Sequence, residues 1–404
     1  MTSHVKPATE KRLRVLLATL YFPSYRVPMW CKLAEHTSID LTLVHNTAPG
    51  VHPGEVGLTN VTKAMPFRVI PRPFPRITWG TRSVVWCTPV HRLLKAEGFD
   101  VVIHDFRTRC ASLGRTIRLQ HRRDGKLILW GIGFSQKPTP LLDYVRTWLV
   151  CRADATVLHS EPNRQRYINM GVPAEKLFVA RNSSRFELID AAISQWSKER
   201  LCIFRQEHGL GTRPVLLHVG RMAEQKRLDL LLRAAVLLRQ DYPGLKIALI
   251  GDGPHRNHLQ EMSSKLGLGN TVLFPGGIDQ EGEVAPWFLL CDLVVAPGQI
   301  GLLAMHAASY GRPLITSDNR TLHGPEVEVF VPGTTGRTYQ YDNLYDLLTA
   351  IRSVLAQPEI RRTMGLCAYK RVRSECGVGN TANGVLKAIA FVTGRSLPLF
   401  APYP

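Results

Sequence analysis

Hydrophobic residues in this chain occur in short runs that alternate with amphipathic segments. In the first half, runs rich in Val, Ile and Leu predict six strands: Val15–Leu20, Ile39–His45, Phe67–Ile70, Asp100–Ile103, Lys126–Trp130 and Ala155–His159. Helical spacing appears between them at Trp30–Glu35 and Thr88–Ala96, and a Pro-rich loop at Pro71–Pro75 follows the third run. Strands that alternate with helices favour a parallel sheet with crossover helices.

The same alternation begins again after residues 182–213, which resemble a linker with a helix near Glu187–Phe204. The next predicted strands are Val215–Val219, Lys246–Ile250, Val272–Phe274, Leu293–Ala296 and Leu314–Thr316. Helical patterns cover Arg227–Arg239, His255–Leu266, Leu302–Tyr310 and segments near 343–356, 359–373 and 379–392. A second α/β sheet therefore follows the first.

A chain of 404 residues is long enough for two such domains. We expect an N-terminal Rossmann-like domain over residues 1–200 and a second one over 201–385. The C-terminal tail, residues 386–404, should pack back on the body, and its end, Leu397–Pro404, is apolar and Pro-rich. Because ligands of open α/β sheets bind outside the carboxyl ends of the strands, we expect a ligand in a cleft between the domains.

The loop after Val215–Val219 has the features of a diphosphate clamp. Gly220 permits a tight turn at the strand end, and Arg221 and Lys226 follow five residues apart. Two cations on one loop can hold a diphosphate from two directions, each contributing about 1.5–3 kcal/mol through charge-assisted hydrogen bonds. The alternative is an ordinary basic loop before a helix.

A second Gly-containing loop follows Leu293–Ala296. Gly298 and Gly301 allow a ligand to approach the backbone, and the helix that begins near Leu302 presents free N–H groups to a phosphate. His306, about one turn into that helix, can bond a sugar hydroxyl. The alternative is a histidine with a purely structural role.

Together these segments resemble the retaining glycosyltransferases of family 4, also called group 1, which have the GT-B fold. The family's motifs occur in order from Pro214 to Gly336. The matching segments are Val219-Gly-Arg221 with Lys226, Ile250-Gly-Asp-Gly-Pro254, Phe274-Pro-Gly276, Asp292 to Pro297, Ala307 to Gly311-Arg-Pro313, and Pro325-Glu326; Ala180-Arg-Asn182 resembles a segment before the second domain.

The resemblance implies a GT-B enzyme whose two Rossmann-like domains face each other across a cleft and close over a nucleotide-sugar. Arg221 and Lys226 would act catalytically by neutralising the departing diphosphate. The resemblance assigns donor binding to Gly220, Gly253, Gly276, Ile278, Gly298, Gly301, Leu302, Leu303, His306 and Glu326.

The chain departs from the family pattern at three positions. The family usually has two glutamates eight positions apart near the second glycine loop, and here they are replaced by Gly298 and His306. Some members carry a histidine in a first-domain loop where this chain has Ile132. These changes leave open a second hypothesis, a degenerate homologue that binds nucleotide-sugar or a partner enzyme without turnover. A third is an epimerase or phosphorylase on the same architecture.

No D-x-D sequence occurs, so we expect a metal-independent transferase without a metal site or cofactor. Retention in this family is thought to use front-face attack, in which the departing phosphate takes the acceptor proton. The expected reaction is sugar transfer to a glycan or lipid-linked acceptor in surface polysaccharide or lipopolysaccharide synthesis.

The first domain should bind the acceptor. Its candidate residues lie in the first loop and at strand ends: Tyr25, Arg26, His104, Asp105, Trp130 and Gly131. Arg115, Arg118 and Arg122 should share one helix face, which would contact an anionic membrane or simply face solvent.

Net charge is +19, and residues 1–200 hold 30 Lys and Arg against 15 Asp and Glu. This imbalance favours a polyanionic partner such as a membrane leaflet, although a generally basic proteome would produce it as well. No helix-turn-helix, zinc or RNP-type motif supports nucleic acid.

The eight cysteines show no C-x-x-C spacing and are expected to be mostly buried free thiols. Reduced cysteines, and the lack of an apolar run of about 18 residues, favour a cytoplasmic protein, peripheral on the inner membrane face if it binds lipid.

Overall fold

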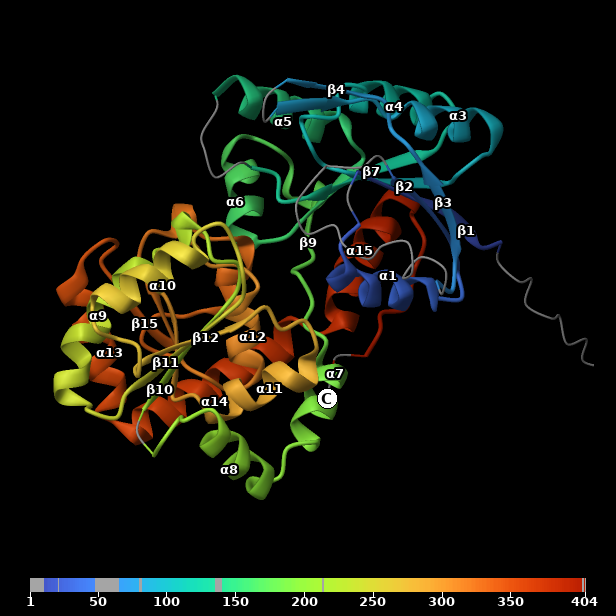
Figure 1. The fold of residues 1–404 in the computed structure, drawn as a ribbon. Helices are drawn as coiled ribbons and strands as arrows, with labels where there is room; N and C mark the ends of the chain where they lie inside the picture. Colours follow the sequence, from blue (N-terminus) through green and yellow to red (C-terminus); the bar gives the residue numbers. More distant parts are fainter. Residues whose placement is uncertain are drawn as a thin grey trace, which may run out of the picture. The chain divides into compact units, whose positions relative to one another are not determined.

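The computed structural model describes residues 11–20, 22–47, 65–79, 82–134, 140–212, 214–401 and 403. The chain divides into two compact units. Residues 1–183 and 378–403 form the first unit, and residues 184–377 form the second. Each unit contains a parallel sheet with helices packed on it (Figure 1).

The first unit is built on a seven-stranded parallel sheet. Its strand order is β3-β2-β1-β6-β7-β8-β9. The strands are β1 Leu13–Thr19, β2 Ile39–Asn46, β3 Arg68–Arg72, β6 Val101–Asp105, β7 Lys126–Gly131, β8 Ala155–Leu158 and β9 Leu177–Val179. The helices are α1 Val27–Ala34, α3 Thr88–Ala96, α4 Leu113–His121, α5 Pro140–Arg152, α6 Glu161–Asn169 and α15 Val378–Thr393. A separate antiparallel pair joins β4 Arg76–Trp79 to β5 Arg82–Val85.

The central strands of this sheet are buried on both faces, which explains their continuous apolar runs. One apolar cluster includes residues of α3, α4 and α5, and the other includes residues of α1 and α15. Helix α15 packs closely on the sheet, because a Cβ atom at Gly384 would lie 2.4 Å from the carbonyl oxygen of Val179. The C-terminal segment therefore completes the first unit.

The second unit has a six-stranded parallel sheet in the order β12-β11-β10-β13-β14-β15. Its strands are β10 Val215–Val219, β11 Lys246–Ile250, β12 Val272–Gly276, β13 Leu293–Ala296, β14 Leu314–Ser317 and β15 Gly336–Tyr339. Its helices are α7 Phe186–Ser194, α8 Lys198–Glu207, α9 Leu228–Asp241, α10 Arg256–Lys265, α11 Glu281–Leu290, α12 Leu303–Ser309, α13 Leu344–Leu355 and α14 Pro358–Glu375. In chain order this is the 3-2-1-4-5-6 arrangement of the Rossmann fold.

These sheets confirm the expected α/β class with two Rossmann-like halves. The predicted strands all occur, but the sequence analysis missed β4, β5, β9, β15 and the helices α5, α6 and α11. Helix α11 contains Pro286, which disfavours a helix locally, yet the surrounding side chains are buried. Tertiary packing therefore outweighs the local preference there.

The boundary between the units differs from the expected one at residue 200. Helices α7 and α8 belong to the second unit, where Trp196 Nε1 donates to the carbonyl oxygen of Gly282 at 2.9 Å. The tail from residue 386 belongs with α15 in the first unit. There Asn383 Nδ2 donates to the carbonyl oxygen of Phe400 at 2.9 Å. Tail residues 402 and 404 lie outside the described residues.

The expectation of mostly buried free thiols was wrong. Cys87 and Cys110 form a disulfide in the first unit. Cys151 and Cys202 are exposed, whereas Cys291 and Cys376 are buried and free. Apolar sequence neighbours did not predict burial, because exposure depends on which helix face carries the cysteine.

Among the described helices, none combines the length and the apolar character that crossing a membrane requires.

Candidate functional site

The predicted donor site lies in the second unit, at the point of the sheet where the chain leaves two adjacent strands toward opposite sides. Strands β10 and β13 are adjacent, but the chain continues from β10 to β11 on one side and from β13 to β14 on the other. The loops after β10 and β13 therefore flank the switch point of the sheet, which is where open α/β sheets bind ligands.

Glycines of the next loop hold the loop after β10 in place. The Met222 amide donates to the carbonyl oxygen of Asp252 at 2.8 Å. Gly253 has φ +153°, and a Cβ atom there would lie 2.3 Å from the carbonyl oxygen of Met222. Gly220, with φ +151°, makes the turn at the end of β10. This packing fixes the backbone on both sides of Arg221, whose side chain is exposed.

Lys226 extends from the first loop to the second. Its Nζ donates to the carbonyl oxygen of Gln299 at 2.8 Å. Burial lowers the pKa of Lys226, and the nearby Glu326 carboxylate opposes that shift. The cation is therefore partly desolvated, which strengthens any interaction with an anionic ligand.

Gly298 shows why a glutamate is missing at that position. Its amide donates to the carbonyl oxygen of Lys226 at 3.0 Å, and the Gln299 amide donates to that of Gln225 at 2.7 Å. A Cβ atom at Gly298 would lie 2.1 Å from the carbonyl oxygen of Gln225. The two loops pair too closely to admit a side chain, so Gly298 contributes only backbone to the site.

The His306 side chain bonds a neighbouring helix. Its Nε2 lies 2.8 Å from Glu281 Oε1, which also accepts a hydrogen bond from the Tyr310 hydroxyl at 2.6 Å. Burial alone would raise the pKa of Glu281, but bonds from His306 and Tyr310 lower it overall. His306 thus has a structural partner in α11, and Glu281 was not predicted from the sequence.

The remaining predicted donor residues lie on the same edge of the second unit. Gly276 ends β12 with φ +95°, and its carbonyl oxygen accepts from the Gly251 amide at 2.7 Å. A Cβ atom at Gly301 would meet Glu326 Oε2 at 3.5 Å, which places the Glu326 carboxylate beside the second loop. Ile278 and Leu303 are half-buried, and Leu302 is exposed.

His323 also supports the second loop, although no sequence motif marks it. Its Nδ1 accepts from the Ile300 amide at 3.3 Å, and Nε2 lies 3.0 Å from the carbonyl oxygen of Ser317. Burial lowers the pKa of His323, so the neutral ring holds the loop after β13 to the end of β14.

The predicted acceptor residues divide between a cavity and the core of the first unit. A cavity of about 210 Å³ at the carboxyl ends of the strands is lined by Arg26, Asp105 and Gly131 among others. Trp130 is buried, with its ring centroid 5.8 Å from Arg26 Cζ, and the ring centroid of Tyr25 lies 5.5 Å from the same atom. His104 is fully buried, with Nε2 3.2 Å from Cys87 Sγ, so it lies in the core.

Four further residues with ionisable side chains line this cavity, and the sequence analysis did not assign them to the acceptor side: Arg107, Arg109, Arg146 and His159. Arg107 and Arg109 follow β6, so their place at a strand end was a usable signal. His159 directly follows β8, so the same signal applied to it, whereas Arg146 is on α5 and had no such signal.

One group of potential metal ligands occurs among the residues that the structure describes: Cys87, His104 and Cys110, all buried. The two cysteines are joined as a disulfide. The group belongs to the first unit, whereas the residues predicted to hold the donor belong to the second unit.

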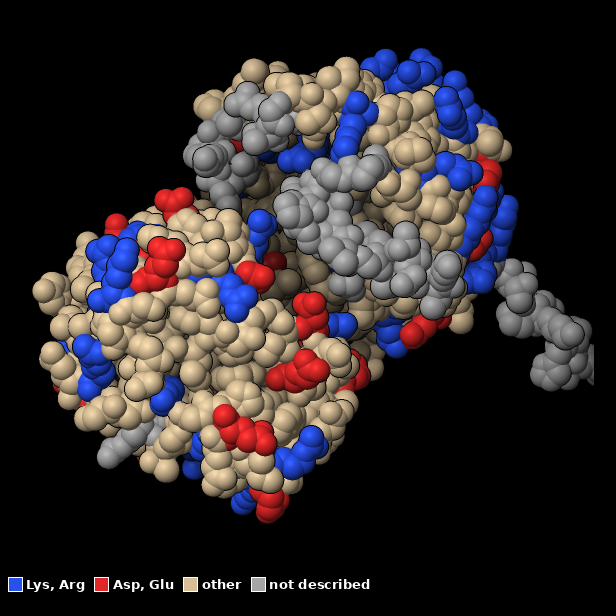
Figure 2. All heavy atoms as spheres, viewed as in Figure 1, with Lys and Arg blue, Asp and Glu red and all other residues tan. Residues whose placement is uncertain are grey.

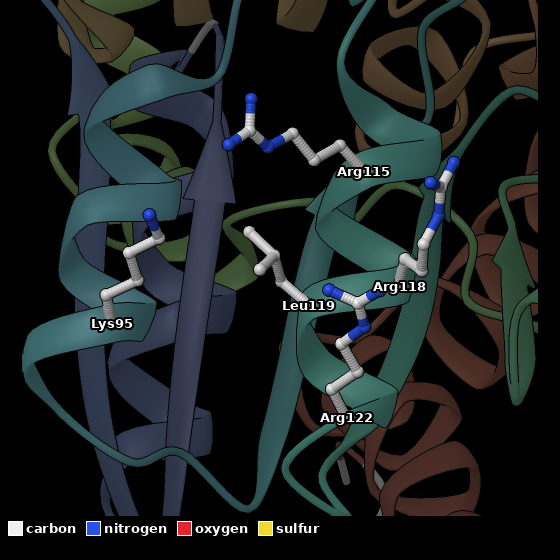
Figure 3. Close-up of a pocket in the computed structure, with 5 residues that line it drawn as sticks. All are labelled: Lys95, Arg115, Arg118, Leu119 and Arg122. Carbon is white, nitrogen blue, oxygen red and sulfur yellow. The ribbon is translucent and has the colours of Figure 1, made fainter.

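Basic side chains also gather between α3 and α4. A groove of about 430 Å³ is lined by Lys95, Arg115, Arg118, Leu119 and Arg122, and Arg115 extends toward α3 (Figure 3). The buried residues of α4 are Leu113, Thr116, Ile117 and Gln120. Arg115 and Arg118, with Arg122 at the C-terminal cap, are exposed on its other side, as predicted. Figure 2 shows Lys and Arg side chains gathered over this part of the first unit.

Residues 203–371 match the family model described as Glycosyl transferases group 1, and this match lies within the second unit. The chain is 29% identical over 172 residues to a GDP-mannose-dependent alpha-(1-6)-phosphatidylinositol monomannoside mannosyltransferase of Mycolicibacterium smegmatis, covering 40% of this chain and 44% of the relative. It is 24% identical over 235 residues to an alpha-D-kanosaminyltransferase of Streptomyces kanamyceticus, and the match covers 57% of this chain and 58% of the relative. The chain thus spans about half the length of these curated relatives.

Solved structures match over nearly the whole chain. The Anabaena protein Alr3699/HepE in complex with UDP has a TM-score of 0.71 at 17% identity, covering 94% of this chain and 100% of that one. A glycosyltransferase from Rickettsia africae has a TM-score of 0.73 at 13% identity, and the match covers 95% of this chain and 100% of that one. At these identities the likeness shows the fold, which is the expected GT-B type with two Rossmann-like units.

Proposed function

We propose that this chain is a glycosyltransferase that moves a sugar from a nucleotide-sugar donor to a glycan or lipid-linked acceptor. The observation that carries the proposal is the pairing of the loops after β10 and β13 at the switch point of the second sheet. Arg221 and Lys226 lie on the first of these loops, within a segment that matches the group 1 family.

The proposed mechanism assigns the two cations to the leaving group. As the bond to the sugar breaks, negative charge grows on the donor diphosphate, and Arg221 and Lys226 stabilise it. The exposed Arg221 guanidinium can reach the phosphates from solvent, whereas Lys226 is oriented by Gln299. We propose metal-independent, retaining transfer by front-face attack, with the departing phosphate accepting the proton of the acceptor hydroxyl.

The donor class is proposed from the relatives. One relative is named as GDP-mannose-dependent, and one structural neighbour binds UDP. The first experiment is therefore nucleotide release by the purified full chain from UDP-, GDP- and ADP-sugars. Loss of release in Arg221→Ala and Lys226→Ala would support the proposal, with Arg362→Ala and Lys265→Ala as exposed controls in the second unit.

A degenerate homologue that binds nucleotide-sugar without turnover is the second candidate. It is favoured by the lack of space for a side chain at Gly298 and by the bond between His306 and Glu281. Thermal stabilisation by a nucleotide-sugar, without nucleotide release, would select this candidate over the transferase.

We further propose that the first unit binds the acceptor and contacts an anionic membrane from the cytoplasmic side. The exposed arginines of α4 supply the positive surface, and the acceptor would belong to surface polysaccharide or lipopolysaccharide synthesis. Binding to vesicles with and without anionic lipid tests the membrane contact.

A further inference from the structure

The cavity at the carboxyl edge of the first sheet occupies the switch point of that sheet. Strands β1 and β6 are neighbours, and the chain leaves them toward opposite sides, to β2 and to β7. Arg26 belongs to the connection after β1, and Arg107 and Arg109 belong to the connection after β6. The first sheet thus presents a cavity where open α/β sheets bind ligands.

The described lining of this cavity is strongly cationic. Arg26, Arg107, Arg109 and Arg146 line it, and Asp105 is the one carboxylate in that lining. Asp105 is already engaged, because its Oδ2 accepts from Thr19 Oγ1 at 3.1 Å and lies 3.3 Å from Arg107 Nε.

A second carboxylate, Asp143, pairs with one of these arginines but does not balance the charge. It pairs with Arg146 through Oδ1 and with Arg166 through Oδ2, the latter at 3.2 Å. The four arginines of the lining and Arg166 thus carry five positive charges, and only two carboxylates oppose them. The cavity therefore keeps a positive excess.

Arg26 is held in the lining by a neutral partner. Its Nη2 lies 2.9 Å from Nε2 of His159, and burial followed by the Arg26 charge keeps the pKa of His159 well below its ordinary value. The neutral ring orients the guanidinium without cancelling its charge. The Nε atom of Arg26 is buried with no hydrogen-bond partner in the described part of the chain. A partly buried cation in this state is destabilising unless an anion reaches it.

Arg107 and Arg109 add two like charges two positions apart in the sequence. Desolvation, followed by the Arg107 charge, lowers the pKa of Arg109. An anion between these side chains would relieve their mutual repulsion. Guanidinium groups also match phosphate oxygens with paired hydrogen bonds.

From this geometry we infer that the cavity binds a phosphate group carried by the acceptor. This inference rests on the proposed transferase function and adds the chemical class of the acceptor. Phosphate suits the positive excess better than a carboxylate because it carries up to two charges and more oxygens for several guanidinium groups. The aromatic side chains of Phe106 and Phe134 offer apolar walls to the rest of the ligand.

The test is titration of the full chain with inorganic phosphate by calorimetry, in an Arg221→Ala, Lys226→Ala background that silences the donor cations. We expect Arg109→Gln and Arg26→Gln each to weaken phosphate binding at least tenfold. Arg92→Gln, an exposed α3 arginine that lines neither this cavity nor the groove beside α4, should leave phosphate binding unchanged. Unchanged binding in both cavity variants, no binding by the background chain, or equal binding of acetate would overturn the inference.

Two further arms separate the sources of the phosphate. Glycerol 3-phosphate represents a soluble phosphomonoester, and vesicles with phosphatidic acid represent a lipid headgroup; the cavity variants should reduce binding of at least one of them. If neither responds, the inference fails. Failure of the transferase proposal would be seen separately, as no nucleotide release by the unmodified chain in a phosphate-free buffer.

Discussion

The Nζ atom of Lys226 donates a hydrogen bond to the carbonyl oxygen of Gln299 at 2.8 Å and thereby links the two loops at the switch point of the second sheet. This contact makes Lys226 both a support for the loop pair and a positive charge at the site. A test of its role has to separate these effects.

We expect Lys226→Ala and Arg221→Ala each to lower kcat for nucleotide release by about 10²–10³-fold, the usual effect of removing one donor to a developing negative charge. Lys226→Arg should retain part of the activity, because it keeps the charge. Steady-state kinetics with the donor found in the screen would measure this. An equal loss in the Lys265→Ala control would count against a local role.

Donor binding should weaken at high pH through Lys226. Burial lowers the pKa of Lys226 below its ordinary 10.5, so the positive charge is lost earlier than usual as pH rises. The Kd for the nucleoside diphosphate should therefore increase between pH 8 and 10. Lys226→Gln should show a flatter profile over that range; parallel profiles would contradict the assignment.

Gly298→Ala should disturb the loop pair because its Cβ atom would lie 2.1 Å from the carbonyl oxygen of Gln225. We expect a loss of about 1–3 kcal/mol in the free energy of unfolding, together with weaker nucleotide binding. Denaturant unfolding and calorimetry measure both. Gly269→Ala is the matched control, since a Cβ atom there meets nothing within 4 Å; similar effects of both substitutions would refute the close-pairing argument.

The Glu281 carboxylate should make the second unit sensitive to acid. Bonds from His306 and Tyr310 lower its pKa below the ordinary 4.5 despite burial, so its stabilising effect is complete at neutral pH and is lost as pH falls through the lowered value. The free energy of unfolding should decrease more steeply between pH 5 and 3 in the original chain than in Glu281→Gln. Identical slopes would show that this carboxylate does not contribute.

Membrane contact through α4 predicts binding that depends on charge and salt. Arg118→Gln with Arg122→Gln should weaken binding to anionic vesicles by roughly 30-fold, at about 1 kcal/mol per cation near the surface. Raising the salt concentration should weaken binding of the original chain, because exposed charges are screened over about 8 Å at physiological ionic strength. Arg362→Gln is the control; equal binding to neutral vesicles would exclude an electrostatic contact.

The sequence by itself determined that there are two sheets, the positions of their strands except the edge strands β9 and β15, and the loops that follow β10, β13 and β6. These features depend on local patterning, since a buried parallel strand requires a continuous apolar run and glycines mark the turns at strand ends. It also indicated Arg221, Lys226, Arg26 and Asp105 as site residues, because each follows or ends a strand.

Only the tertiary structure decided which groups meet at those strand ends. Glu281 reaches His306 from another helix, His159 reaches Arg26 across 133 positions, and Gly298 lies against the loop that carries Lys226. The return of α15 to the first unit was likewise not encoded in a local motif. Such contacts depend on strand order and on how crossover helices pack, and these are properties of the whole sheet that no short segment carries.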